Sequence, residues 1–120
     1  MRFLMLQLGD RSADGRPTGP LGEAVRAYEE DLRTAGVVLA SETLHPSRTA
    51  TSVRFGDGDP VVFDGPSGTS GLVVRGFRIL DVRSAADAVA WARRSPFDVS
   101  SRTAGQVVIE IHEIDDGPPW

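Results

Sequence analysis

The sequence shows two stretches of helical periodicity, and strand-like stretches lie on both sides of each. This pattern restricts the chain to a small number of folds. Apolar residues recur at helical spacing over residues 20–35 and 84–95. The expected strands are residues 2–8, 37–43, 51–55, 61–63, 77–82 and 106–114. A turn-rich run from Gly56 to Pro60 joins the third and fourth strands and predicts a hairpin. This order predicts an α+β fold, a ferredoxin-like sandwich with both helices on one sheet face, in a single domain spanning residues 1–120.

Alternation within the first and last strands indicates what the second face of the sheet carries. Leu4, Leu6 and Leu8 share one face of the first strand, and Glu110 and His112 share one face of the last. Because both helices cover one face, the other face is either closed by a second subunit or left partly open. Polar groups on that side favour a lined cavity for a small molecule over a dry core, and a homodimer is the economical way to close it.

The first helix carries a run of charges on the face away from its apolar stripe. These residues are Glu23, Glu29, Glu30 and Asp31. Charged residues on that side of an amphipathic helix usually face solvent. The sequence therefore predicts a scaffold helix with a solvated acidic face.

Composition removes several classes of chemistry. All 13 basic residues are arginine, and lysine and cysteine are absent, which excludes Schiff bases, Walker A phosphate loops, thiol nucleophiles, disulfides and thiolate metal sites. A net charge of -4 and a pI near 5.1 argue against a nucleic-acid partner. The apolar run Phe3–Leu8 is too short for a signal segment or a membrane span, so we expect no membrane contact and a cytoplasmic location.

The two histidines are the candidate bases near neutral pH. Glu110 lies two positions before His112 on the same strand face, where its carboxylate would hold one imidazole tautomer and favour the protonated ring. His45 follows Glu42 in a loop and is a candidate for the second half of the same pocket. An exposed polar pair and a solvated loop histidine are the structural alternatives. No spacing of these groups is diagnostic of a metal, so neither a metal nor a cofactor is expected.

The Gly-rich loop after the hairpin offers weaker signals. Asp57, Asp59 and Asp64 lack the spacing of a calcium loop, and no lysine or helix follows the glycines to make a phosphate loop. Asp64 either closes a local turn or contributes to a site. Ser67 and Thr69 lack the neighbouring base motif of a nucleophile, so we expect them to contact a ligand.

Several motifs together resemble the YCII-related family in its DGPF branch. They are Glu42–Pro46, Thr49–Arg54, Phe63–Pro66, Gly76–Val82, Ser84–Ala92 and Val108–Ile111. The resemblance implies a dimeric α+β barrel of ferredoxin-like subunits, mostly of unknown activity, with His/Asp acid–base chemistry suspected in some members. This chain departs from the branch at Ser67–Gly71, which replaces a phenylalanine and a charged run. It also departs at His112, where arginine is usual, and at His45, where glutamine is common.

Two functions are consistent with these observations. The first is a small-molecule pocket on the open sheet face of a homodimer, where Asp64 orients or stabilises a histidine and His45 or His112 moves a proton. Glu42, Glu110, Ser67 and Thr69 would complete this pocket, with the Gly-rich loop as a partial lid. The second is a non-catalytic, ligand-sensing or partner-binding regulatory module, a role suggested by relatives encoded near alternative sigma factors.

Overall fold

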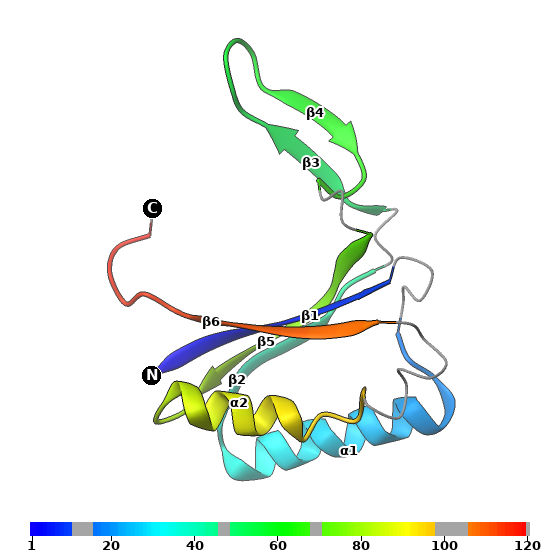
Figure 1. The fold of residues 1–120 in the computed structure, drawn as a ribbon, viewed down its shortest axis with the longest axis vertical. Helices are drawn as coiled ribbons and strands as arrows, with labels where there is room; N and C mark the ends of the chain where they lie inside the picture. The colour runs from blue at the N-terminus through cyan, green and yellow to red at the C-terminus, as the bar shows by residue number, and fades with distance from the viewer. Residues whose placement is uncertain (11–15, 46–48, 68–70, 98–105, 120) are drawn as a thin grey trace.

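The computed structural model describes residues 1–10, 16–45, 49–67, 71–97 and 106–119 (Figure 1). Its elements, in chain order, are β1 (Arg2–Asp10), α1 (Gly19–Ala35), β2 (Val38–Thr43), β3 (Thr51–Arg54), β4 (Val61–Asp64), β5 (Leu72–Asp81), α2 (Ala85–Arg93) and β6 (Val107–Glu113). The order of elements is the one predicted. No helix in the described part of the chain is long and apolar enough to cross a membrane.

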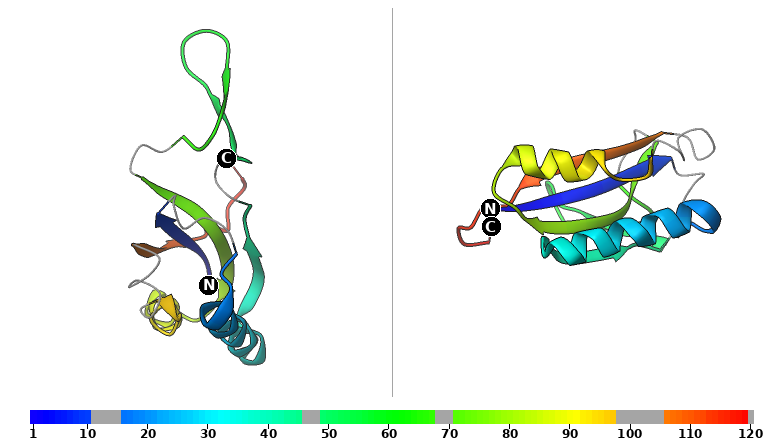
Figure 2. Two further views of the ribbon diagram at one scale, coloured as in Figure 1. Left: turned by 90° about the vertical axis from the view of Figure 1, so that its right-hand side faces the viewer. Right: turned by 90° about the horizontal axis from the view of Figure 1, so that it is seen from below.

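The main sheet has four antiparallel strands in the order β2-β5-β1-β6, and β3 and β4 pair separately as a hairpin. Both helices lie against one side of this sheet (Figure 2). With the hairpin set aside, the topology is the ferredoxin-like one, in which each strand–helix–strand unit places its two strands on either side of a central strand. The prediction of a ferredoxin-like α+β fold is therefore confirmed.

The helix ends follow local sequence signals. Gly36 caps α1 in the left-handed conformation, with φ of 71°, where the absence of a Cβ removes the steric penalty. Ser84 caps α2, and its hydroxyl oxygen accepts a hydrogen bond from the Asp87 backbone N–H at 3.2 Å. Both caps are formed by residue types that favour these positions.

The core lies between the sheet and the helices. Its buried residues are Phe3, Met5, Tyr28, Leu32, Leu80, Val82 and Ala88. Directly paired residues of antiparallel strands point to the same face, so the pairing of Phe3 with Leu80 and of Met5 with Arg78 assigns all four to the helix-covered face. We call this side of the sheet the helix face.

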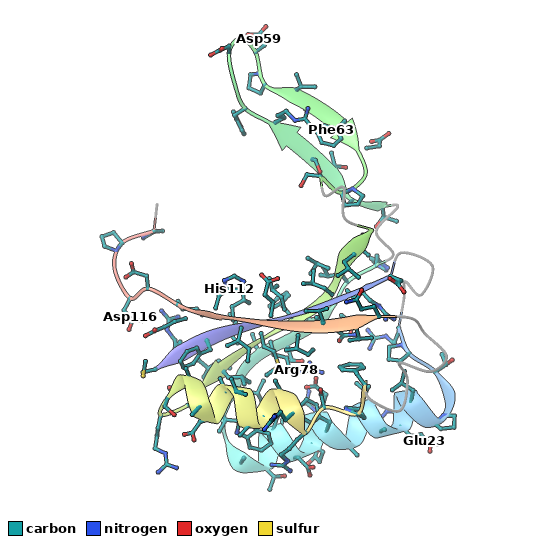
Figure 3. All side chains as sticks on the ribbon, in the orientation of Figure 1. Glu23, Asp59, Phe63, Arg78, His112 and Asp116 are labelled. Atoms are coloured by element: carbon teal, nitrogen blue, oxygen red, sulfur yellow. The ribbon has the colours of Figure 1, made fainter. Side chains whose placement is uncertain are left out.

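The opposite side, which we call the open face, is built by two rows of paired residues across the sheet. The rows are Ala40, Ile79, Leu4 and His112, and Glu42, Phe77, Leu6 and Glu110. No helix of the described residues covers this face (Figure 1). Its apolar residues are only partly buried. Figure 3 shows His112 on this side, away from the helices, and Arg78 between the sheet and the helices.

The β3–β4 hairpin projects beyond the sheet on the side away from the helices (Figure 1). Four of its apolar side chains are strongly exposed: Val53, Phe55, Val61 and Val62. An isolated two-stranded hairpin is only marginally stable in water. The hairpin therefore exposes apolar surface that no contact among the described residues covers.

One sequence-based prediction about α1 is wrong. Glu23, Glu30 and Asp31 are exposed as expected, but Glu29 is largely buried, with 16% of its side chain accessible. Its carboxylate turns toward the sheet because Arg78 occupies an inward position of β5 and supplies a buried positive charge. A buried charge of one sign needs a partner of the other, and Glu29 is that partner.

Candidate functional site

His112 and Glu110 form the only histidine–carboxylate pair among the described residues. Both side chains leave β6 on the open face, and His112 Nε2 lies 2.5 Å from Glu110 Oε1. A carboxylate accepts hydrogen bonds, so the ring nitrogen facing it carries the proton. This arrangement leaves Nδ1 of a neutral ring able to accept a proton from a ligand. About half of each side chain is accessible, so a bound molecule can reach the pair.

Glu42 stands at the other edge of the open face, in the same row as Glu110. Phe77 and Leu6 lie between them, so the two carboxylates are three strand spacings apart, roughly 14 Å. At that separation the two groups cannot share a proton. Instead, the two carboxylates lie at opposite edges of the apolar surface formed by Phe77 and Leu6. This surface is wide enough for a small ring.

His45 and the turn after β4 lie at a different place. His45 is exposed beyond the end of β2 and lines an apolar cavity of about 340 Å³ together with Pro66. The turn is fixed to the start of the hairpin by the Gly65 N–H, which donates to the Ala50 carbonyl oxygen at 2.6 Å. The Asp64 side chain is exposed at the end of β4.

The structure does not couple Asp64 to a histidine. Among the described residues, no hydrogen bond or ion pair joins it to His45 or His112. The predicted site residues therefore fall into two groups, one around His112 on the sheet and one around His45 at the base of the hairpin.

The remaining predicted contacts lie at the edge of what the structure describes. Ser67 is exposed just after the turn. Thr69 and the centre of the proposed lid, 68–70, fall outside the described residues. Within the described ranges, no three histidine, aspartate or glutamate side chains gather as a metal site would require.

Sequence reasoning missed the buried charges on the helix face. Arg78 donates from Nε and Nη2 to Glu29 Oε1, each at 2.5 Å, and the Ser41 hydroxyl donates to the same oxygen at 2.9 Å. The Arg78 guanidinium also lies 5.2 Å from the ring centre of Tyr28. The available signal was an arginine at an inward position of an apolar strand, Phe77–Leu80.

Among the described residues, Tyr28 is the titratable group whose pKa is shifted most clearly by its environment. Burial raises the pKa of the Tyr28 hydroxyl above its usual 10.0, because the charged phenolate would lose its hydration. The hydroxyl donates to the Trp91 carbonyl oxygen at 2.6 Å, which ties α1 to α2. This bond needs the protonated phenol.

A family model and a solved structure are similar to this chain. The YCII-related domain matches residues 1–112 of the chain. No curated protein matches. One solved structure with a similar arrangement is the 5-chloro-2-hydroxyhydroquinone dehydrochlorinase of Burkholderia phenoliruptrix in complex with 2,5-dihydroxybenzoquinone. It shares 15% sequence identity, with a TM-score of 0.48 over 98% of this chain and 96% of that one.

Proposed function

Because the chain belongs to the YCII-related domain family, we propose that it binds a small molecule on its open face, within a homodimer that closes this face. The observation that carries the proposal is the position of the His112–Glu110 pair. The two side chains stand at the rim of an apolar floor built by Leu4, Leu6 and Phe77. Ligand sites usually combine an apolar lining with a few polar groups.

Two features of the molecule favour a second copy as the cover. The open face presents a row of apolar side chains to solvent, although such a face is normally packed against another layer. The hairpin projects on the same side and exposes Phe55 by 77% and Val62 by 65%. A second copy placed on the open face would cover both surfaces, and a two-fold arrangement is the commonest way to do so.

The chemistry available in this pocket is proton transfer. Glu110 holds the His112 proton at Nε2, which leaves Nδ1 to accept a proton from a ligand and return it. The ligand best matched to this site is small, flat and largely apolar, with one ionisable group near His112. Glu42 at the opposite edge would repel a second negative charge and so orient the ligand. His45 and Asp64, at the base of the hairpin, would complete the pocket together with Ser67 and Thr69.

Methyl NMR with phenol and benzoate as probes tests the binding site. Saturable shifts of the Leu4, Leu6 and Ile79 methyl groups, with Leu32 and Leu80 on the helix face unaffected, would support the proposal. Saturable shifts confined to the helix-face methyl groups, or no saturable shift at all, would refute it.

Sedimentation velocity tests the dimer. The native chain should sediment as a dimer, and Leu6→Glu should give a folded monomer because it places a charge in the proposed interface. Glu23→Gln, on the exposed face of α1, is the matched control and should leave the dimer intact. A native monomer across the concentration range would contradict the proposed closure.

A specific observation also favours a second function, a non-catalytic ligand-sensing module. Asp64 forms no hydrogen bond or ion pair with either histidine among the described residues, so the Asp–His couple of an acid–base enzyme is not assembled in this conformation. Ligands that bind the open face can be followed by NMR over hours. Conversion that is slowed by His112→Gln supports catalysis, whereas unchanged ligand with full binding supports the sensing module.

A further inference from the structure

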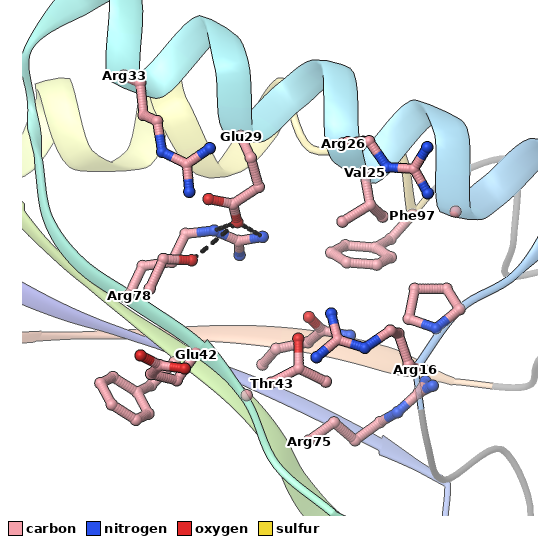
Figure 4. A pocket seen from close by; sticks show the side chains of 16 residues that line it. Arg16, Val25, Arg26, Glu29, Arg33, Glu42, Thr43, Arg75, Arg78 and Phe97 are labelled. Carbon is pink, nitrogen blue, oxygen red and sulfur yellow. Dashed lines mark hydrogen bonds and ion pairs between the residues drawn. The ribbon is translucent and has the colours of Figure 1, made fainter.

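A second cavity, on the helix face, has five arginines in its lining. It has a volume of about 250 Å³ and lies between α1 and the edge formed by β2 and β5. Its arginines are Arg16, Arg26, Arg33, Arg75 and Arg78, and its carboxylates are Glu29 and Glu42. We call this cavity the arginine cleft. Figure 4 shows Arg26 and Arg33 extending from α1, and Arg16 and Arg75 on the opposite side of the cleft.

The cleft carries positive charge that its own carboxylates do not balance. Glu29 is already bound by the buried Arg78 and by Ser41. Glu42 pairs in register with Phe77 and so belongs to the open face. Three further arginines form no ion pair with any residue that the structure describes: Arg16, Arg26 and Arg33. In a chain whose net charge is -4, this is a local concentration of cations.

Arg75 is directed into the cleft by a β-bulge. Gln7 pairs with Gly76 and Leu8 with Val74, so Arg75 is the extra residue of β5 at this point. Regular alternation would send its side chain to the open face, and the bulge redirects it. Its aliphatic part passes over Gly9, where a Cβ would lie 2.6 Å from Arg75 Cδ. A side chain at position 9 would therefore have to displace the end of this arginine.

A second glycine brings Arg16 to the cleft. The chain enters α1 through Pro17, whose carbonyl oxygen would lie 2.8 Å from a Cβ at position 22. Gly22 has no Cβ, so the segment carrying Arg16 and Pro17 can lie directly against the first turn of the helix. Gly22 thus lets the segment of Arg16 lie against the helix, and Gly9 leaves room for the end of Arg75.

We propose that the arginine cleft binds the phosphate group of a small phosphorylated molecule. Planar guanidinium groups match the oxygens of phosphate in paired hydrogen bonds, and arginine is the preferred residue for this recognition. A phosphate monoester carries close to two negative charges and three acceptor oxygens, which suits several converging cations better than a single carboxylate does. The volume accommodates a phosphate with a few further atoms. The proposal goes beyond the function proposed for the open face, with which the cleft shares Glu42 and Phe77 at the edge of the sheet.

Calorimetry and ³¹P NMR with glycerol 3-phosphate as the probe test this site. The native protein should bind it saturably, with shifts at the Gly22 and Gly76 amides that line the cleft. Arg33→Gln and Arg16→Gln should each raise Kd about tenfold or more, because each removes charge-assisted hydrogen bonds. Arg83→Gln is the matched control, since it removes the same charge from a side chain that is 94% exposed and lies outside the cleft. Its Kd should stay within about twofold.

Several results would overturn the proposal. One is the absence of saturable binding, and another is an equal loss of affinity in Arg83→Gln, which would indicate attraction by diffuse charge only. Succinate that binds more tightly than glycerol 3-phosphate at equal ionic strength would replace phosphate by a carboxylate ligand. Circular dichroism of each variant verifies that it is folded, and the exposed positions of Arg16 and Arg33 make loss of the fold unexpected.

Discussion

The buried pair of Arg78 and Glu29 provides the sharpest test of the packing on the helix face. Arg78→Met removes the cation, keeps an unbranched side chain and leaves the Glu29 carboxylate buried beside Tyr28. Breaking a buried ion pair from one side costs about 3–5 kcal/mol. With 16% of the Glu29 side chain accessible, we expect about 3 kcal/mol. For 120 residues the unfolding entropy is about 0.25 kcal/mol per kelvin, so Tm should fall by roughly 12 °C.

The double variant Arg78→Met, Glu29→Met separates two quantities: the net contribution of the ion pair to the free energy of unfolding, and the cost of leaving one buried charge without its partner. Replacing both charges by apolar groups of similar size is often neutral or stabilising. We therefore expect the double variant to be more stable than Arg78→Met, and close to the native protein. Urea unfolding, at one protein concentration for all variants, measures these free energies. A single variant within 1 kcal/mol of the native protein, or a double variant as unstable as the two single losses combined, would refute the reasoning.

Three further predictions follow from the core and the sheet. Leu32→Ala should lower the free energy of unfolding by about 2–5 kcal/mol in urea, because Leu32 is fully buried and its loss leaves a cavity; a loss below 1 kcal/mol would contradict the packing. Because burial raises the pKa of Tyr28 in the folded state, its stabilising effect is complete below pH 10 and declines as the pH rises through the folded value. Tyr28→Phe should remove that part of the alkaline decline, and an unchanged profile would contradict the burial. Gly76→Ala should cost roughly 1–3 kcal/mol, because its Cβ would lie 2.8 Å from the Glu42 carbonyl oxygen; a neutral effect in urea would show that β2 can shift.

Local signals explain why most of the fold could be predicted. The periodicity of each helix depends on residues within that one element, and the caps at Gly36 and Ser84 are signals of the same local kind. The start of β5 was missed, because Gly76 interrupts the strand pattern and the observed strand begins at Leu72 rather than Phe77. Pairing with β1 and β2 on both sides holds this glycine in the sheet, and such pairing is not visible in the local sequence.

The candidate sites differ in the same way: contacts between residues close in sequence were predicted, and contacts between distant segments were not. Glu110 and His112 were predicted to share a face because they are two residues apart in one strand. Glu29 and Arg78 are 49 residues apart, and their contact depends on how α1 lies across the sheet. The arginine cleft was missed for the same reason, since its cations come from separate segments, and Arg16, Arg26 and Arg33 each look like an ordinary surface residue.

The bulge at Arg75 also bears on how this surface can change between related chains. Val74 and Gly76 already pair with consecutive residues of β1, so deleting Arg75 would leave every other pair of these two strands in register. The deletion would remove one guanidinium and replace one backbone hydrogen bond, that of Leu44 N–H with the Arg75 carbonyl oxygen. Insertion or deletion of a single codon thus adds or removes one charge of the cleft without changing the strand register. The ligand preference of this face can therefore evolve separately from the fold.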